Sequence, residues 1–113
     1  MKAYTDIEQS KKLAEMLSIE SADMFWADGE RPAVWNNKDI SLDETDIPAW
    51  SFVALLEVIP YSQVNFISLP SNGENLFVIQ VLCGEEWKFG NWKSNPIDAC
   101  VEMIFELKEK DLL

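Results

Sequence analysis

Tryptophan side chains beside a charged turn are the residues of this sequence best suited to bind a partner. Trp26 and Trp35 flank the segment from Asp28 to Pro32, and Trp92 lies beside a second turn-like segment. Tryptophan is enriched among the residues that anchor protein interfaces. The alternative, that these three rings close over a small core, stays open. The candidate binding surface consists of Trp26, Trp35, Trp92, Asp28, Glu30 and Arg31.

The remaining two tryptophans are predicted to fill the core. Trp50 belongs to an apolar run that leaves almost no polar face. Trp87 alternates in phase with Phe89, while Glu86 and Lys88 take the other phase. This alternation is typical of a half-buried strand with its aromatic side chains directed inward.

Catalytic chemistry is restricted by the complete absence of histidine. This absence excludes Ser-His-Asp and Cys-His catalysis and the most common zinc sites. The two cysteines, Cys83 and Cys100, have no CxxC spacing, and we expect both to be free thiols. Cys100 is interpreted as a small core residue, not as a nucleophile. No catalytic residue is therefore predicted, and an enzymatic role is not favoured.

Carboxylates dominate the charge of the chain. Twenty acidic residues against nine basic residues give a net charge of −11, and residues 20–46 alone carry −6. Such a field repels nucleic acid and anionic lipid and attracts basic partners. We therefore expect neither nucleic acid nor a membrane as a partner. Solubility is the simplest role for this charge.

No bound metal or cofactor is predicted. The segment from Asp39 to Thr45 spaces its oxygen atoms as a calcium loop does, but Glu44 replaces the required glycine and Trp50 the required glutamate. The four glycines form neither a P-loop nor a GxGxxG motif. The segment MKAYTDIEQSKK lacks the apolar core of a signal peptide, and no apolar run reaches the length of about 20 residues that spans a membrane. We therefore expect a soluble cytoplasmic protein.

Three helices are predicted to position these residues. The first begins at Thr5, with Glu8 completing a capping box, and runs to about Leu17. The second covers residues 47–60, with Pro48 in its first turn and Pro60 at its end. The third covers residues 95–113, with Asn95 as its cap and Pro96 at the first helical position.

Strands are predicted between the helices. A hairpin joins residues 22–27 to residues 32–36, and Asn72-Gly73 turns a second hairpin between residues 63–69 and 75–82. A further strand covers residues 85–92. The order α-β-β-α-β-β-β-α predicts one α+β domain over residues 1–113, with a mostly antiparallel sheet of four to five strands covered by three helices.

Three segments carry a resemblance to a known group of proteins. They are YTDIEQSKKLAEMLSIESADM, IPAWSFVALLEVIP and NPIDACVEMIFELKEK. These segments resemble signature blocks of a family of short uncharacterised proteins from gut Bacteroidetes and their phage-like or mobile elements. The resemblance covers most of the chain and is lowest over residues 61–92. Ala49 stands where relatives often have cysteine, so the resemblance assigns no catalytic thiol there. Because the family has no assigned activity, the resemblance implies only a small, phage-associated accessory protein.

The leading hypothesis is a non-enzymatic module that binds another protein or a second copy of itself. One alternative is an acidic DNA mimic that inhibits a basic nucleic-acid-binding protein, although the mixed charges of the third helix argue against it. Another alternative is a carboxylate-based enzyme without histidine. That alternative requires a concave pocket and a strongly perturbed Asp or Glu.

Overall fold

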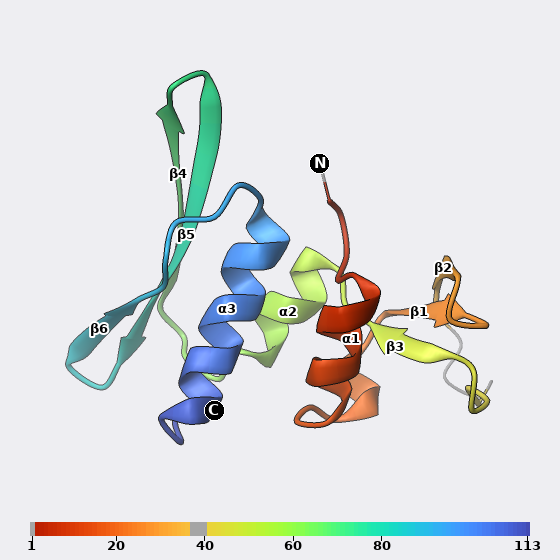
Figure 1. The fold of residues 1–113 in the computed structure, drawn as a ribbon. Helices are drawn as coiled ribbons and strands as arrows, with labels where there is room; N and C mark the ends of the chain where they lie inside the picture. Colours follow the sequence, from red (N-terminus) through yellow and green to blue (C-terminus); the bar gives the residue numbers. More distant parts are fainter. Residues whose placement is uncertain (1, 37–40) are drawn as a thin grey trace. The chain divides into compact units, whose positions relative to one another are not determined.

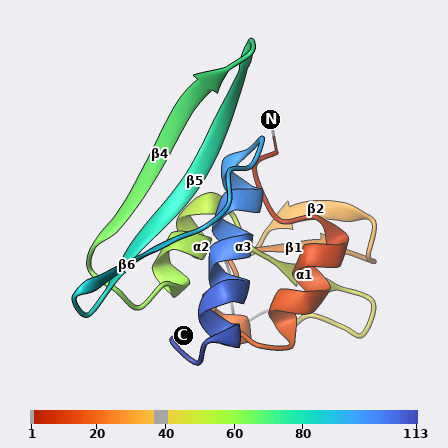
Figure 2. The same cartoon turned by 60° about the vertical axis from the view of Figure 1, so that its left-hand side comes forward.

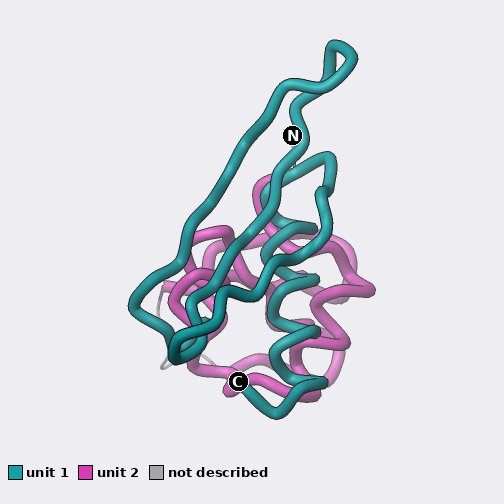
Figure 3. The backbone as a smooth tube through the Cα atoms, turned by 90° about the vertical axis from the view of Figure 1, so that its left-hand side faces the viewer, with its two compact units in different colours: residues 1–2, 59–113 teal, residues 3–58 magenta. Residues whose placement is uncertain are grey.

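Three α-helices and six strands follow one another along residues 2–36 and 41–113, which the computed structural model describes (Figure 1). The mixture confirms the predicted α+β class. By their internal contacts the residues fall into two compact units, coloured separately in Figure 3. The N-terminal unit comprises residues 3–58, and the C-terminal unit comprises residues 59–113 together with residues 1–2.

The N-terminal unit is built around a three-stranded antiparallel sheet. Strand β1 (Met24–Ala27) lies between β2 (Arg31–Val34) and β3 (Ile47–Ala49). Helix α1 (Ile7–Ala14) packs against β3, and helix α2 (Phe52–Val58) contacts the short 3-10 helix η1 (Ile19–Ser21). The β1-β2 hairpin confirms the predicted pairing on either side of the charged turn, in which Asp28 and Gly29 both have positive φ.

Helix α1 begins later than predicted, because its capping box uses different residues. Asp6 is the N-cap, and its carboxylate accepts a hydrogen bond from the Gln9 N–H at 2.8 Å. The Gln9 side chain in turn accepts the Asp6 N–H at 3.2 Å. Thr5 cannot serve as the cap, since its side chain is fully buried and its hydroxyl accepts the N–H of Trp50.

The predicted helix over residues 47–60 is wrong at its beginning, where β3 takes its place. Ile47, Pro48 and Ala49 pair with β1, and β3 is an edge strand, where the missing N–H of proline is tolerated. The helix begins only after Ser51, whose hydroxyl accepts the Ala54 N–H at 3.3 Å. The Asp23 carboxylate holds Ser51 in place by accepting its N–H at 2.8 Å and its hydroxyl.

The C-terminal unit consists of a second three-stranded antiparallel sheet and helix α3 (Pro96–Glu109) (Figure 2). The sheet has the order β4 (Val64–Ser71), β5 (Glu74–Cys83) and β6 (Glu86–Phe89), and α3 packs on β5. The β4-β5 hairpin is confirmed, with positive φ at both turn residues, Asn72 and Gly73. The cap of α3 is also confirmed, since Asn95 accepts the Asp98 N–H at 2.8 Å.

The single sheet of four to five strands is therefore a wrong prediction, since the six strands form two separate sheets. The short β3, absent from the prediction, gives β1 its second neighbour. Each sheet is thereby completed by strands that are close in sequence, which keeps the entropic cost of loop closure small. None of the described helices combines the length and the apolar character needed to cross a membrane.

The two thiols are expected to differ sharply in reactivity. Cys100 lies in α3 with no exposed surface, and burial raises the pKa of its thiol to about 12, whereas Cys83 is half-buried at the end of β5. Because the thiolate is the reactive species, Ellman's reagent should modify only Cys83 in the native protein and both cysteines after unfolding. Cys83→Ala should abolish the native reaction. Equal rates at both thiols would contradict this expectation.

Candidate functional site

Five of the six predicted binding residues lie on or beside the β1-β2 hairpin of the N-terminal unit, and Trp92 belongs to the C-terminal unit. Trp26 is half-buried, and its indole N–H donates to the Thr5 carbonyl at 3.1 Å. Its ring meets Tyr4 edge-on, with 5.7 Å between centroids. The polar atom of Trp26 is therefore already used within its own unit.

Trp35 is buried, so its ring closes over the core and is not an exposed part of the candidate binding surface. Only 7% of its surface is accessible, and its ring contacts Phe25 edge-on at 6.3 Å. Its backbone N–H donates to the Asp23 carbonyl at 2.9 Å, which extends the hairpin pairing beyond β2. Trp50 is fully buried as predicted, while Trp87 is half-buried. Of the three candidate tryptophans, Trp92 exposes the largest fraction of its surface, 43%.

The charged end of the hairpin forms an acidic cluster with the segment before β3. The Asp46 carboxylate accepts the Asp28 N–H at 2.9 Å and the Asp43 N–H at 3.1 Å. The Thr45 hydroxyl and N–H both donate to Asp43, and these bonds lower the pKa of the Asp43 carboxyl below its ordinary value. Glu30 and Arg31 are exposed beside it, and the Arg31 guanidinium approaches Asp28 to 3.9 Å.

Asp28, Asp43 and Asp46 are the described residues that could hold a cation together. One oxygen of each carboxylate lies within 4.8 Å of the others, and hard cations prefer such oxygen ligands. Asp46 joins the segment to the hairpin turn by accepting the Asp28 N–H, and Asp43 accepts the Thr45 N–H within the segment, so closing this loop accounts for the arrangement. Asp39, the first residue of the calcium-like spacing, lies outside the described residues.

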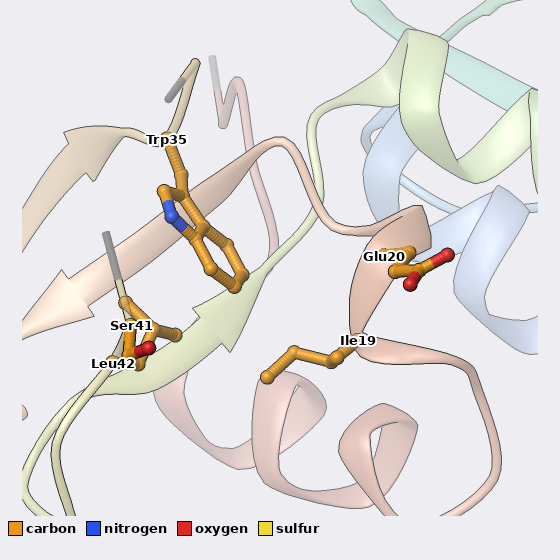
Figure 4. Close-up of a pocket in the computed structure, with 5 residues that line it drawn as sticks. All are labelled: Ile19, Glu20, Trp35, Ser41 and Leu42. Carbon is orange, nitrogen blue, oxygen red and sulfur yellow. The ribbon is translucent and has the colours of Figure 1, made fainter. Parts of the chain in front are cut away.

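A shallow pocket of about 310 Å³ lies beside Trp35 (Figure 4). Its lining consists of Ile19, Glu20, Trp35, Ser41 and Leu42. The ring of Trp35 points into it, opposite the Ile19 side chain from η1. The volume is at the lower end of the range of about 300–1,000 Å³ typical of small-molecule sites, and aliphatic and aromatic groups suit a small apolar ligand.

The carboxylate-based alternative would require an acid whose pKa is raised toward neutrality. The structure lowers the pKa values of the Asp43 and Glu86 carboxyl groups. The Lys88 ammonium causes the shift at Glu86 through a 2.9 Å hydrogen bond and through its charge. Both groups are thus ionised at neutral pH and cannot act as general acids.

The sheet of the C-terminal unit has one face against α3 and one face without a helix of that unit. A Cβ atom on Gly90 would lie 3.6 Å from the Met103 side chain of α3, and the Gly90 N–H donates to the Ile79 carbonyl. The side chains in phase with Ile79 therefore face α3. The opposite phase forms what we call the open face: Asn65, Ile67, Leu69, Leu76, Val78, Gln80, Leu82, Trp87 and Phe89.

Trp92 joins this face through a β-bulge. After β6 the chain stays beside β5, because Phe77 and Lys93 exchange two hydrogen bonds of 2.7 and 2.8 Å. Two residues, Asn91 and Trp92, thus oppose the single residue Val78. The Asn91 amide donates to Glu102 of α3, which leaves Trp92 as the side chain of the bulge on the open face.

The open face is mostly apolar, partly exposed and free of charged side chains. Its polar residues, Asn65 and Gln80, hydrogen-bond to each other, and Val78 is buried. Leu69, Phe89 and Trp92 expose 50%, 58% and 43% of their surfaces, but Phe89 also lines a hollow together with α3 residues such as Glu102 and Phe105. The charged residues of β6, Glu86 and Lys88, lie in the other phase and pair with each other. The sequence prediction included Trp92 and omitted Leu69, and it placed the Phe89 side chain on the inward side of its strand. The run Leu76 to Leu82, apolar on both faces apart from Gln80, was the available signal that both sides of β5 border apolar surface.

No protein-family model, curated protein or solved structure matches this chain. The resemblance to short Bacteroidetes proteins therefore stays an expectation. The functional interpretation of the open face depends on the structure alone.

Proposed function

We propose that this chain is a non-enzymatic protein-interaction module that binds another protein through the open face. The observation that carries the proposal is an uncharged, mostly apolar sheet face with the large, exposed side chains of Leu69 and Trp92, in a chain of net charge −11. Contiguous exposed apolar patches on water-soluble domains typically mark interaction sites. Exposed aromatic rings such as Trp92 are the side chains that most often dominate binding energy.

The apolar surface and the negative charge of the chain also indicate which kind of partner would fit. An apolar patch must cover Leu69 and Trp92, and basic side chains around that patch would complement the acidic field. Exposed carboxylates lie at both ends of the sheet, Glu74 beside the β4-β5 turn and Glu85 in the β5-β6 turn. The partner is therefore a protein with an apolar patch bordered by Lys or Arg.

Two variants of the open face, Leu69→Ser and Trp92→Ala, should each lose the partner. The tagged full chain is used to isolate binding proteins from a bacterial lysate, and each candidate is purified and titrated calorimetrically. We expect either substitution to weaken binding at least tenfold, as hot-spot truncations of about 2 kcal/mol do. Moderate salt should leave most of the affinity, since apolar contact is not screened.

The matched control is Val53→Ser, which changes another exposed aliphatic residue, 63% accessible, in the N-terminal unit. It should bind within about twofold of the parent chain. A partner that binds both open-face variants normally would contradict the proposal. If that partner also dissociated in moderate salt, acidic mimicry of DNA would be the better interpretation.

A further inference from the structure

We propose that the hollow between the end of β6 and helix α3 holds an arginine side chain of the partner protein. This inference rests on the proposed function and deepens it, because it assigns a place to one of the basic side chains that border the partner's apolar patch. Phe89 belongs to the open face and also lines the hollow. A protein that covers the open face can therefore reach the hollow.

The hollow lies entirely within the C-terminal unit and has a volume of about 290 Å³. Two phenyl rings, three carboxylates and one amide line it: Phe89, Asn91, Glu102, Phe105, Glu106 and Glu109. Sites for small molecules typically have volumes of about 300–1,000 Å³. The hollow is just below this range, so its size suits one inserted side chain better than a cofactor.

Helix α3 supplies four of the lining residues from one face. Glu102 is followed at i+3, i+4 and i+7 by Phe105, Glu106 and Glu109, a spacing that places their side chains in one row. The Asn91 amide donates to Glu102 and thereby joins the segment after β6 to the helix. The hollow thus has two walls that a hydrogen bond connects.

The carboxylates of the hollow outnumber its cations. The Lys93 ammonium is 3.0 Å from Glu102, and the Lys110 ammonium is 2.8 Å from Glu106. Glu109 is exposed and has no ion pair among the described residues, which leaves the hollow with a net charge of −1. The pKa of Lys110 is raised, chiefly by its hydrogen bond to Glu106 and further by charges that include Glu109. This field attracts one more cation.

The combination of rings and carboxylates selects a guanidinium group. A guanidinium stacks on aromatic faces and donates hydrogen bonds to carboxylates in its own plane, whereas an ammonium is compact and more strongly hydrated. Phe89 and Phe105 supply the faces, and Glu109 supplies an acceptor that is not already in an ion pair. Arginine therefore fits this lining better than lysine.

Other classes of ligand fit the lining less well. Glu102 and Glu109 are seven residues apart, about 10 Å along the helix, so they cannot converge on one metal ion. An anion is repelled by the carboxylates. An uncharged apolar group would remove them from water without replacing their hydrogen bonds.

The test titrates the ¹⁵N-labelled full-length chain with N-acetyl-argininamide at constant ionic strength and follows the amide resonances by NMR. We expect saturable shifts at the Asn91 side-chain amide and at the backbone amides of Glu106 and Glu109, with a dissociation constant of about 1–10 mM. N-acetyl-citrullinamide, which has nearly the same shape and no charge, should bind at least tenfold more weakly.

Two substitutions that remove the same charge locate the site. Glu109→Gln should weaken the binding of N-acetyl-argininamide about threefold, as loss of an exposed charge pair does. The matched control is Glu74→Gln, since Glu74 lies on β5 six residues from Gln80, the partner of Phe89, or about 20 Å away. It should leave the affinity unchanged. Phe89→Leu, which removes a ring and keeps an apolar side chain, should also weaken binding about threefold.

Three results would overturn the inference, and the first needs only the unmodified chain. Shifts that do not saturate, or that spread evenly over the acidic surface, would show that no arginine site exists at α3. Equal weakening by Glu109→Gln and Glu74→Gln would assign the effect to net charge alone. Tighter binding of N-acetyl-lysinamide than of N-acetyl-argininamide would assign the hollow to an ammonium group.

The two proposals fail separately. A chain that does not bind N-acetyl-argininamide but loses its partner with Leu69→Ser and Trp92→Ala would reject the arginine site and leave the proposed function standing. A chain that binds N-acetyl-argininamide in the hollow, but whose partner is indifferent to both open-face substitutions, would reject the docking face.

Discussion

Replacing Trp50 with alanine is expected to lower the free energy of unfolding by about 3–5 kcal/mol, the usual cost of truncating a buried aromatic side chain. Trp50 has no accessible surface and is the largest of the fully buried side chains. Its indole N–H donates to the Ser21 hydroxyl at 2.9 Å, so alanine would leave a cavity and remove this hydrogen bond, while the Ser21 hydroxyl keeps its bond to the Ser18 carbonyl. Urea unfolding followed by far-ultraviolet circular dichroism measures the loss.

Two substitutions calibrate this result. Trp50→Phe keeps most of the apolar volume and removes the indole N–H, so it should cost less than Trp50→Ala. Trp92→Ala makes the same chemical change at a ring that is 43% exposed, and we expect it to cost below about 1 kcal/mol. If alanine at positions 50 and 92 were equally tolerated, Trp50 would not be the centre of a packed core.

Thr5→Val is expected to destabilise the protein by about 3 kcal/mol, although valine has nearly the same shape. Thr5 and Ser10 are both fully buried, and their hydroxyls are 2.7 Å apart. The Thr5 hydroxyl also accepts the Trp50 N–H at 3.1 Å. Valine would remove this acceptor and leave a buried N–H without a partner, at a cost of about 1–3 kcal/mol for each orphaned group. Thermal and urea unfolding would measure the change.

Two further variants separate the contribution of the Thr5 hydroxyl from the contribution of side-chain packing. Thr5→Ser retains the hydroxyl and loses one methyl group, so it should cost only about 1 kcal/mol. In Thr5→Val the buried Ser10 hydroxyl keeps only its long bond to the Thr5 carbonyl, at 3.4 Å, so adding Ser10→Ala should recover part of the lost stability. A Thr5→Val protein as stable as Thr5→Ser would show that this hydrogen-bond network contributes little.

The local elements could be predicted wherever their signals lie within a few residues. Asn95 and Pro96 begin α3 as expected, because capping depends only on the first turn of the helix. Asn72-Gly73 closes the β4-β5 hairpin, because only a few residue types adopt positive φ in succession at low cost. The α+β class followed from such signals, as did the buried position of Trp50.

The candidate site depended on contacts that no local pattern contains. Asp23 holds Ser51 across 28 residues, and this contact accompanies the division of one apolar run into β3 and α2. The alternation around Trp87 predicted a strand but could not say which phase would meet α3, because both phases of the sheet are rich in apolar side chains.

The sequence by itself therefore determined most of the element types, the two hairpin turns and the absence of histidine chemistry, but not strand β3. Only the tertiary structure decided that Trp35 is buried, that Trp92 is exposed, and that Leu69 shares its face. The physical reason is that exposure depends on which strands become neighbours. That choice is made by pairings far apart in the sequence, whereas caps and turns are decided within about four residues.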